Sequence, residues 1–194
     1  MPKLTIFDLD NTLLAGDSDR AWGQYIVEKK IVSNDFLIES EKFYNSYYEG
    51  DLDIDGFLAF CLKPLTENKL SELLELRKDF IEEKIKPMML DRAIKTVKLK
   101  KLEGPVIIAT ATNSFVTRPI ADLFEIKDLI ATEFVIKNNE FTGEVDGIPC
   151  FREGKVKKVE EWVNANGYDL SSATFYSDSF NDLPLLQKVE RAIV

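Results

Sequence analysis

Two aspartates, Asp8 and Asp10, lie two positions apart in an otherwise apolar run near the N-terminus. The run, TIFDLDNTLL (residues 5–14), has the composition of a strand buried between layers. An unpaired carboxylate in such an interior is costly or shifts to its neutral form. Residues i and i+2 of a strand face the same way, so both carboxylates point to one face. Taken alone, the pair fits a polar edge of a sheet as well as it fits a functional site.

A second acidic cluster follows another apolar run. The segment YSDSFNDLP (residues 176–184) carries Asp178, Asn181 and Asp182 at the end of the strand-like run 173–178. Clustered carboxylates repel one another unless a cation joins them. Oxygen ligands without histidine or thiolate favour a hard ion, of which Mg²⁺ fits best. Calcium is the competing ion, but the ligand spacing and the glycine of an EF-hand loop are absent.

Thr110 and Lys155 are candidates for contact with an anion. Thr110 ends a third apolar run and precedes a helix expected to start near Ser114, where free N–H groups suit a phosphoryl oxygen. On its own, Thr110 fits a turn residue or an N-cap more simply. Lys155 opens another expected helix, an end at which the helix dipole favours acids. A lysine there makes sense if it neutralises a bound anion or the acidic cluster.

The spacing of apolar runs predicts an α/β fold, a Rossmann-like parallel sheet sandwiched by helices. Strands are expected over residues 4–9, 105–111, 173–178 and 191–194, and helices over 88–102 and 154–167. Residues 132–145 alternate around Asn138–Asn139, which indicates a β-hairpin. Functional groups of such a sheet gather at the carboxyl ends of its strands, where both acidic clusters fall.

A long segment between the first two strands, residues 15–88, has no convincing strand and exceeds an ordinary crossover. We expect it to form an inserted helical cap, with residues 1–14 and 89–194 as the catalytic core. The expected N-caps of its helices are Asp17 or Ser18, Ser33, Asp53 and Thr66. A stripe at helical spacing comprises Leu70, Leu73, Leu74, Phe80, Ile81 and Ile85.

Four motifs in this order resemble the haloacid dehalogenase-like superfamily, and most closely its phosphoserine-phosphatase-like branch. They are D-x-D-x-T at residues 8–12, an apolar run ending in Thr110, Lys155, and SDSFND at residues 177–182. D-x-D-x-T alone is moderately specific, whereas all four in order are strongly so. The resemblance covers essentially the whole chain, including the cap and the hairpin.

The resemblance implies a role for each motif residue. Asp8 is expected to attack phosphorus and become an aspartyl phosphate, and Asp10 to act as general acid and then as base. The Asp8 carboxylate, the Asp10 carbonyl and Asp178 are expected to bind Mg²⁺. Thr110 and Lys155 are expected to hold phosphoryl oxygens. The supporting residues around the metal and Lys155 are expected to be Asp182 and Asn181.

Departures from the branch bear on the substrate. Thr110–Ala111–Thr112 stands where phosphoserine phosphatases have Ser-Gly-Gly, and Ser177, Ser179 and Phe180 stand in a motif that is commonly glycine-rich. Asp17 occupies the place of an acidic residue that engages the substrate's amino group there, although an N-cap is the simpler interpretation. Further candidates for substrate binding are Asn113 and Arg118, with Arg20 as a second arginine that could meet a carboxylate. The aromatic residues of the insert are expected to form mainly its core, with one or two lining a pocket.

Composition excludes several classes of function. The chain of 194 residues has a net charge of −9 and no histidine, which excludes histidine-based catalysis and histidine metal sites. The acidic charge argues against nucleic-acid and anionic-membrane binding. Two distant cysteines, no signal-peptide pattern and no apolar run near the ~20 residues of a membrane span suggest a cytoplasmic protein.

The sequence therefore predicts a Mg²⁺-dependent phosphatase that acts on a small-molecule phosphomonoester, with a phosphoserine-like substrate among the options. A phosphotransferase with the same aspartyl phosphate is the alternative closest in chemistry. A receiver-like phosphoacceptor and a non-catalytic binding relative are alternatives of other classes. The residue pattern leaves open the leaving group, the oligomeric state and any structure beyond Val194.

Overall fold

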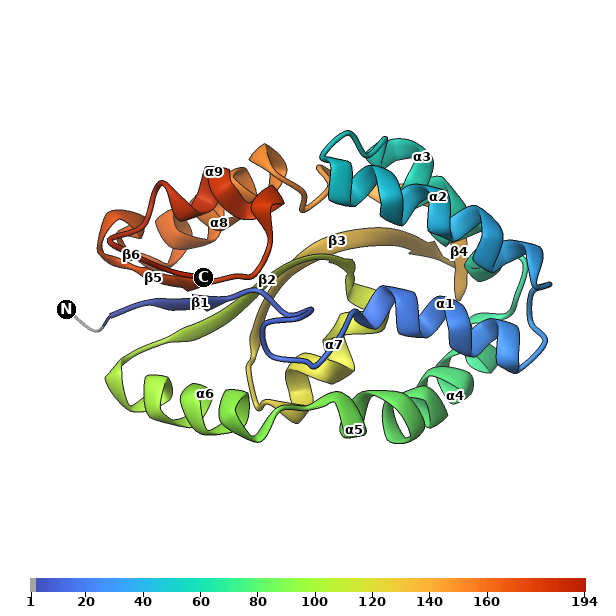
Figure 1. The fold of residues 1–194 in the computed structure, drawn as a ribbon, viewed down its shortest axis with the longest axis horizontal. Coiled ribbons are helices and arrows are strands. Elements are labelled where there is room, and N and C mark those ends of the chain that lie inside the picture. The colour runs from blue at the N-terminus through green and yellow to red at the C-terminus, as the bar shows by residue number, and fades with distance from the viewer. Residues whose placement is uncertain (1–2) are drawn as a thin grey trace.

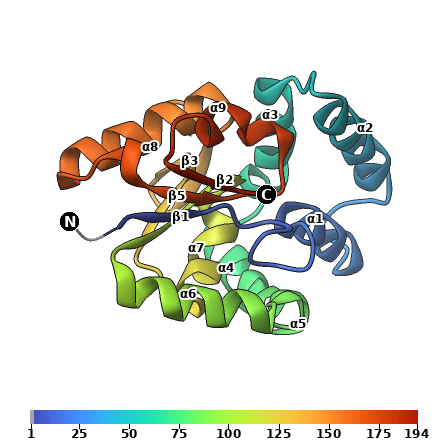
Figure 2. The same ribbon diagram turned by 60° about the vertical axis from the view of Figure 1, so that its left-hand side comes forward.

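A six-stranded sheet with helices on both faces forms the centre of the computed structural model, which describes residues 3–194 (Figures 1 and 2). The strand order is β4-β3-β2-β1-β5-β6, and every neighbouring pair is parallel except β3 and β4. The predicted Rossmann-like α/β fold is confirmed. The strands are β1 (Thr5–Phe7), β2 (Val106–Asn113), β3 (Asp128–Lys137), β4 (Glu140–Asp146), β5 (Thr174–Tyr176) and β6 (Arg191–Ile193).

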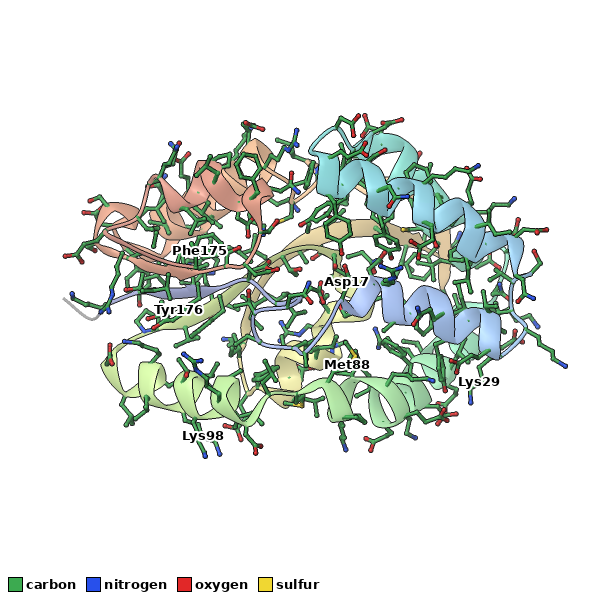
Figure 3. The ribbon with its side chains drawn as sticks, viewed as in Figure 1. Asp17, Lys29, Met88, Lys98, Phe175 and Tyr176 are labelled. Atoms are coloured by element: carbon green, nitrogen blue, oxygen red, sulfur yellow. The ribbon has the colours of Figure 1, made fainter. Side chains whose placement is uncertain are left out.

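β1 lies at the centre of the sheet and sends its side chains into two apolar clusters. Ile6 packs into the cluster on the face of α8, whereas Phe7 packs into the cluster on the opposite face. β5 alternates in the same way, with Phe175 and Tyr176 on opposite sides of the sheet (Figure 3). Phe7 pairs with Ile108 of β2 and with Tyr176 of β5. The carboxyl ends of β1, β2 and β5 therefore lie side by side at the same end of the sheet.

The predicted hairpin is confirmed, and its first strand is longer than expected. Asn138 and Asn139 connect β3 to β4 with φ of 53° and 61°, the left-handed pair that a tight hairpin turn needs. However, β3 begins at Asp128 and its first half pairs in parallel with β2. That half is largely buried and so lacks the alternation that reveals a half-exposed strand.

Helices cover the two faces of the sheet in the predicted order. α6 (Asp91–Glu103) and α7 (Ser114–Leu123) lie on one face, and α8 (Glu153–Asn166) and α9 (Leu183–Leu186) on the other (Figure 2). α7 begins at the predicted Ser114. α6 ends at Gly104, where an added Cβ would meet the carbonyl oxygen of Lys3 at 2.4 Å, so only glycine fits.

Residues 15–88 form helices, as predicted. They are α1 (Ser18–Glu28), α2 (Asp35–Glu49), α3 (Ile54–Thr66), α4 (Leu70–Phe80), a π-helical turn (Ile81–Ile85) and α5 (Lys86–Met88). Within residues 3–194, no helix is long and apolar enough to cross a membrane.

Two of the predicted N-caps are confirmed and two are wrong. Asp17 and Asp53 accept hydrogen bonds from backbone N–H groups at the starts of α1 and α3. Ser33 is not a cap, because α2 begins one residue later, behind Asn34. Thr66 is the last residue of α3, and its hydroxyl donates back to the Lys63 carbonyl at 2.9 Å. A threonine at a helix end satisfies itself in this way and resembles a cap in the sequence.

Part of the insert shares an apolar cluster with the sheet. The Trp22 ring of α1 meets Phe80 of α4 edge-on at 5.2 Å and Phe115 of α7 at 5.7 Å. Arg77 of α4 donates to the Phe115 carbonyl at 2.6 Å and lies over its ring. In the predicted stripe Leu73, Phe80, Ile81 and Ile85 are buried, while Leu74 is 39% exposed. The boundary between core and cap stays a prediction, because this cluster crosses it.

The two segments that enter and leave the insert are joined by backbone hydrogen bonds. Leu14 and Met89 form an antiparallel bridge, and the Ala15 N–H donates to the Met88 carbonyl at 2.7 Å. Gly16 follows with φ of 143°, and an added Cβ there would lie 2.9 Å from the Met88 side chain. The chain thus enters and leaves the insert at neighbouring positions, and Figure 3 shows Asp17 and Met88 near this place.

We predict that Phe80→Ala lowers the free energy of unfolding by about 3–5 kcal/mol, because it opens a cavity between α1, α4 and α7. Urea denaturation followed by circular dichroism measures this loss. Leu102→Ala is the matched control, since Leu102 is 85% exposed and its truncation is expected to change stability by less than about 0.5 kcal/mol. Equal effects of the two substitutions would contradict the shared cluster.

Candidate active site

A cavity of about 190 Å³ lies at the carboxyl ends of β1, β2 and β5, beneath α2 and α3. Its sheet side carries the residues that the motifs singled out, and its opposite side carries aromatic rings of the insert. The predicted residues that line it are Asp8, Asp10, Asp17, Thr110, Lys155, Asp178, Asn181 and Asp182. The aromatic lining comprises Phe43, Tyr44, Tyr47, Tyr48, Phe57, Phe151 and Phe180.

Lys155 is buried between two carboxylates at the base of this cavity. Its Nζ lies 3.1 Å from Asp8 Oδ1 and 2.6 Å from Asp182 Oδ1. Ser177 donates to the other oxygen of Asp182 at 2.7 Å. Burial lowers the pKa of Lys155, but the carboxylates of Asp182 and Asp8 outweigh it and raise that pKa above its ordinary value. Lys155 therefore stays a cation.

Burial raises the pKa of Asp8 well above its ordinary value, and the charge of Lys155 opposes this rise. The hydrogen bond from Lys155 reaches Oδ1. Within the described part of the chain, no hydrogen bond occupies Asp8 Oδ2. This oxygen is free to act as a nucleophile or as a ligand.

Two hydrogen bonds hold the carboxyl group of Asp10 in place. The backbone N–H of Ser18 at the start of α1 donates to Oδ1 at 2.6 Å, and the Thr112 hydroxyl donates to Oδ2 at 2.8 Å. Burial and the neighbouring charge of Asp17 raise the pKa of Asp10 to about 7. A carboxyl group with this pKa both gives and takes a proton near neutral pH. Sequence reasoning assigned no role to Thr112, which fixes the direction of this carboxyl.

Asp178 and Thr110 complete the sheet side of the cavity. Thr12 donates to Asp178 Oδ1 at 3.3 Å, and partial desolvation raises the pKa of this carboxyl, although the residue is exposed to solvent. Thr110 is buried, and its hydroxyl accepts a hydrogen bond from the Thr112 N–H at 3.3 Å. Its position at the cavity wall suits contact with an anion.

The donor groups present suit a hard cation. Within residues 3–194, no three side chains of histidine, cysteine, aspartate or glutamate gather into a metal cluster. The predicted ligand set requires fewer, because it combines the carboxylates of Asp8 and Asp178 with the backbone carbonyl of Asp10. Oxygen ligands of this kind, with room for water, fit Mg²⁺ better than zinc.

Two further acids face the cavity on the side of the insert. Asp17 caps α1 by accepting from the Arg20 N–H at 2.9 Å, and it lies at the start of that helix (Figure 3). Asp19 accepts from the Tyr44 hydroxyl at 3.2 Å. Burial and the charge of Asp19 raise the pKa of Asp17 to about 6. Burial and the charge of Asp10 raise the pKa of Asp19 to about 6. Sequence reasoning missed Asp19, although the D-S-D pattern signalled it.

The other predicted substrate-binding residues are not brought to this cavity. Asn113 caps α7 by accepting from the Val116 N–H at 3.1 Å. Arg118 donates to the carbonyls of Ile126 and Lys127. Neither residue lines the cavity.

The cavity carries little positive charge. Arg20 pairs with Glu41 and lies over the Tyr44 ring, outside the lining. Lys155 is the only lysine or arginine among the described residues of the lining, and two carboxylates already pair it.

Arg152 is a residue that no sequence signal indicated. It precedes α8, and its Nε donates to Asn181 Oδ1 at 3.0 Å. Asn181 in turn donates to the Tyr47 carbonyl of α2 at 3.3 Å. The predicted Asn181 therefore lies at the boundary between the sheet side and the insert.

We predict that Asp19→Asn stabilises the metal-free protein at pH 8 and not at pH 4. The pKa of Asp19 is raised from 3.8 to about 6 in the folded state, so stability is lost as pH rises through this range. Asparagine removes that loss, which we expect to amount to about 1–3 kcal/mol. Urea denaturation at both pH values in chelator measures it, with the exposed Asp146→Asn as control. An equal effect at both pH values would show that the pKa of Asp19 is not raised in the folded protein.

Comparison with known proteins places the chain in a family. The model of the haloacid dehalogenase-like hydrolases matches residues 5–187. A histidinol-phosphatase of Neisseria meningitidis serogroup C (strain 8013) is 38% identical over 199 residues, covering 100% of this chain and 90% of that protein.

Solved structures agree with this assignment. A Bordetella pertussis Tohama I protein with unknown function has a TM-score of 0.89 and 34% identity, over 99% of this chain and 89% of that one. A substrate-bound phosphoserine phosphatase has a TM-score of 0.72 over 99% of this chain and 85% of that one, and at 18% identity it shows the fold alone. The resemblance predicted from the motifs is confirmed, and the chain belongs to the haloacid dehalogenase-like hydrolase family.

Proposed function

We propose that this protein is a Mg²⁺-dependent phosphatase that hydrolyses a small phosphomonoester through an aspartyl phosphate on Asp8. The observation that carries the proposal is the buried set of ion pairs Asp8–Lys155–Asp182 at the floor of a cavity, where Ser18 and Thr112 also hold Asp10. The name of the Neisseria relative, histidinol-phosphatase, supports the same reaction.

Each side chain of the site has its own role in the proposed reaction. Lys155 and the Thr110 hydroxyl hold phosphoryl oxygens, and Asp8 Oδ2 attacks phosphorus as the bond to the ester oxygen breaks. Asp10 donates its proton to the departing alcohol. Asp10 then accepts a proton from the water that attacks the aspartyl phosphate, which releases phosphate and restores Asp8.

Mg²⁺ would be held by the carboxylates of Asp8 and Asp178 and the carbonyl of Asp10, and would offset the charge of the phosphoryl group. The ion pair with Asp182 holds Lys155 in place, so the positive charge of Lys155 stays next to Asp8. Ser18 and Thr112 orient Asp10 for proton transfer by donating hydrogen bonds to its two carboxyl oxygens.

The charge of the cavity favours a leaving group that carries an amine and no carboxylate. Asp17 and Asp19 face the leaving-group side, together with aromatic rings that favour cations. No unpaired lysine or arginine lines the described cavity to receive a carboxylate. A like charge placed beside these acids would cost several kcal/mol. Histidinol phosphate, an amino alcohol ester with a basic imidazole ring, satisfies these conditions, whereas phosphoserine brings a carboxylate.

We predict that phosphate release requires both Mg²⁺ and Asp8. Chelation is expected to abolish turnover of p-nitrophenyl phosphate, and Asp8→Asn to lower kcat by at least ~1,000-fold because no nucleophile remains. A phosphate-release assay measures both, with Asp146→Asn as the matched acid-to-amide control. Hydrolysis that survives Asp8→Asn would exclude the aspartyl phosphate.

We predict that kcat/KM for L-histidinol phosphate exceeds that for O-phospho-L-serine by about 100-fold. Phosphoethanolamine, which has the amine without a carboxylate, is expected to fall between them. Asp19→Asn should reduce the preference, because it removes one of the two charges on the leaving-group side. A preference for phosphoserine would contradict the assignment of substrate class while leaving the reaction itself intact.

A further inference from the structure

Arg152 occupies a backbone conformation that normally belongs to glycine. Its φ is 48° and its ψ is −119°, and the Gly154 N–H donates to the Phe151 carbonyl at 2.9 Å. These values match the first central position of a type II′ turn, which favours glycine because a Cβ is crowded there. A side chain kept at such a position against backbone strain points to a use for that side chain.

The guanidinium of Arg152 connects the insert to the loops of the active site. Nε donates to Asn181 Oδ1 at 3.0 Å, and Nη2 donates to the carbonyl of Gly50, the residue that ends α2. Asn181 is adjacent to Asp182, and Arg152 lies three positions before Lys155. One planar cation therefore bridges the end of α2 and the two segments that carry the Lys155–Asp182 pair.

Two more hydrogen bonds hold the same end of α2. Asn181 Nδ2 donates to the Tyr47 carbonyl at 3.3 Å, and the Tyr47 hydroxyl lies 2.7 Å from Ser179 Oγ. Figure 1 shows this end of α2 next to the chain that leads into α8 and α9. The C-terminal carbonyls of a helix carry partial negative charge and attract a cation, which suits an arginine better than a neutral donor.

Gly50 has a backbone conformation that favours glycine. It ends α2 with φ of 80°, and an added Cβ would lie 3.4 Å from Arg152 Nη2. Both ends of the bridge thus have an unusual backbone: a glycine in the left-handed region on α2, and an arginine in a glycine conformation before α8.

We propose that Arg152 is a positioning residue that holds α2 over the cavity and so encloses the leaving group during phosphoryl transfer. The kinetic part of this inference rests on the proposed phosphatase function, whereas the structural part stands on the bridge alone. α2 contributes Phe43, Tyr44 and Tyr47 to the cavity wall, so loss of the bridge releases the wall that contacts the leaving group.

Two substitutions separate the side chain from the strained backbone. Arg152→Ala removes the bridge and keeps the strain, whereas Arg152→Gly removes both. We expect both variants to lower kcat/KM by about 10–100-fold for whichever of the three amine-bearing esters is hydrolysed best, mainly through KM. Acetyl phosphate, whose leaving group is too small to reach α2, should change by less than about threefold. The Tm of Arg152→Gly should exceed that of Arg152→Ala by about 2–4 °C.

Glu125→Gly is the matched control, because Glu125 also has a left-handed φ, of 55°, and its exposed side chain lies outside the cavity. It is expected to leave kcat/KM unchanged for both substrates. Amide hydrogen exchange adds a readout that needs no turnover: residues 47–52 should exchange at least about fivefold faster in both Arg152 variants.

Unchanged exchange at residues 47–52 would overturn the inference whether or not the protein hydrolyses any ester. Equal losses for the large substrate and for acetyl phosphate would also overturn it, because Arg152 would then act on the chemistry or the fold. A Tm of Arg152→Gly at or below that of Arg152→Ala would show that the turn is not strained. A wild-type chain that hydrolyses no ester would refute the proposed function, and hydrogen exchange alone would then decide on the bridge.

Discussion

The buried ion pair chain of Asp8, Lys155 and Asp182 is the constraint on which the rest of the structure depends. Three charges in a dry interior are tolerated only if each has a partner, and here one cation lies between two anions. These three residues come from the end of β1, α8 and the loop after β5, so the ion pairs form only when these three segments have come together. The ion pairs also explain how a central strand ends in an acid that solvent barely reaches.

The insert serves two different purposes in its two halves. α1 and α4 pack on α7 through Trp22, Phe80 and Phe115, and α1 also presents the Ser18 N–H that orients Asp10. α2 and α3 instead provide the aromatic wall of the cavity. Under the proposed function, one half supports the catalytic groups, and the other meets the part of the substrate that differs from one ester to another. The proposed Arg152 bridge acts on the second half.

Sequence reasoning predicted which motif residues line one cavity, because their positions follow from a general rule. Parallel strands bring their carboxyl ends to one edge, so acids after two strands and a threonine ending a third must converge. It located Asp17 and Asp53 because capping depends on local chemistry. It missed the first half of β3, because a buried strand shows no alternation. It missed Arg152, because a contact between segments distant in the sequence leaves no periodic pattern. It named Arg118 as a candidate for substrate binding, but the carbonyls of Ile126 and Lys127 accept hydrogen bonds from this arginine.

The long separation between the partners of the site has a consequence for how the chain acquires its fold during synthesis. β1 is made before its partners: within the described residues it pairs with β2 and β5, and Lys155 lies 147 residues beyond Asp8. Bringing such distant segments together costs chain entropy before any contact rewards it. While the chain grows on the ribosome, the apolar strand with its two acids has no strand partner until β2 emerges, and it meets β5 and Lys155 later still. The two charges that we propose for the reaction would also make this unpaired segment less prone to aggregate, since like charges keep exposed strands apart.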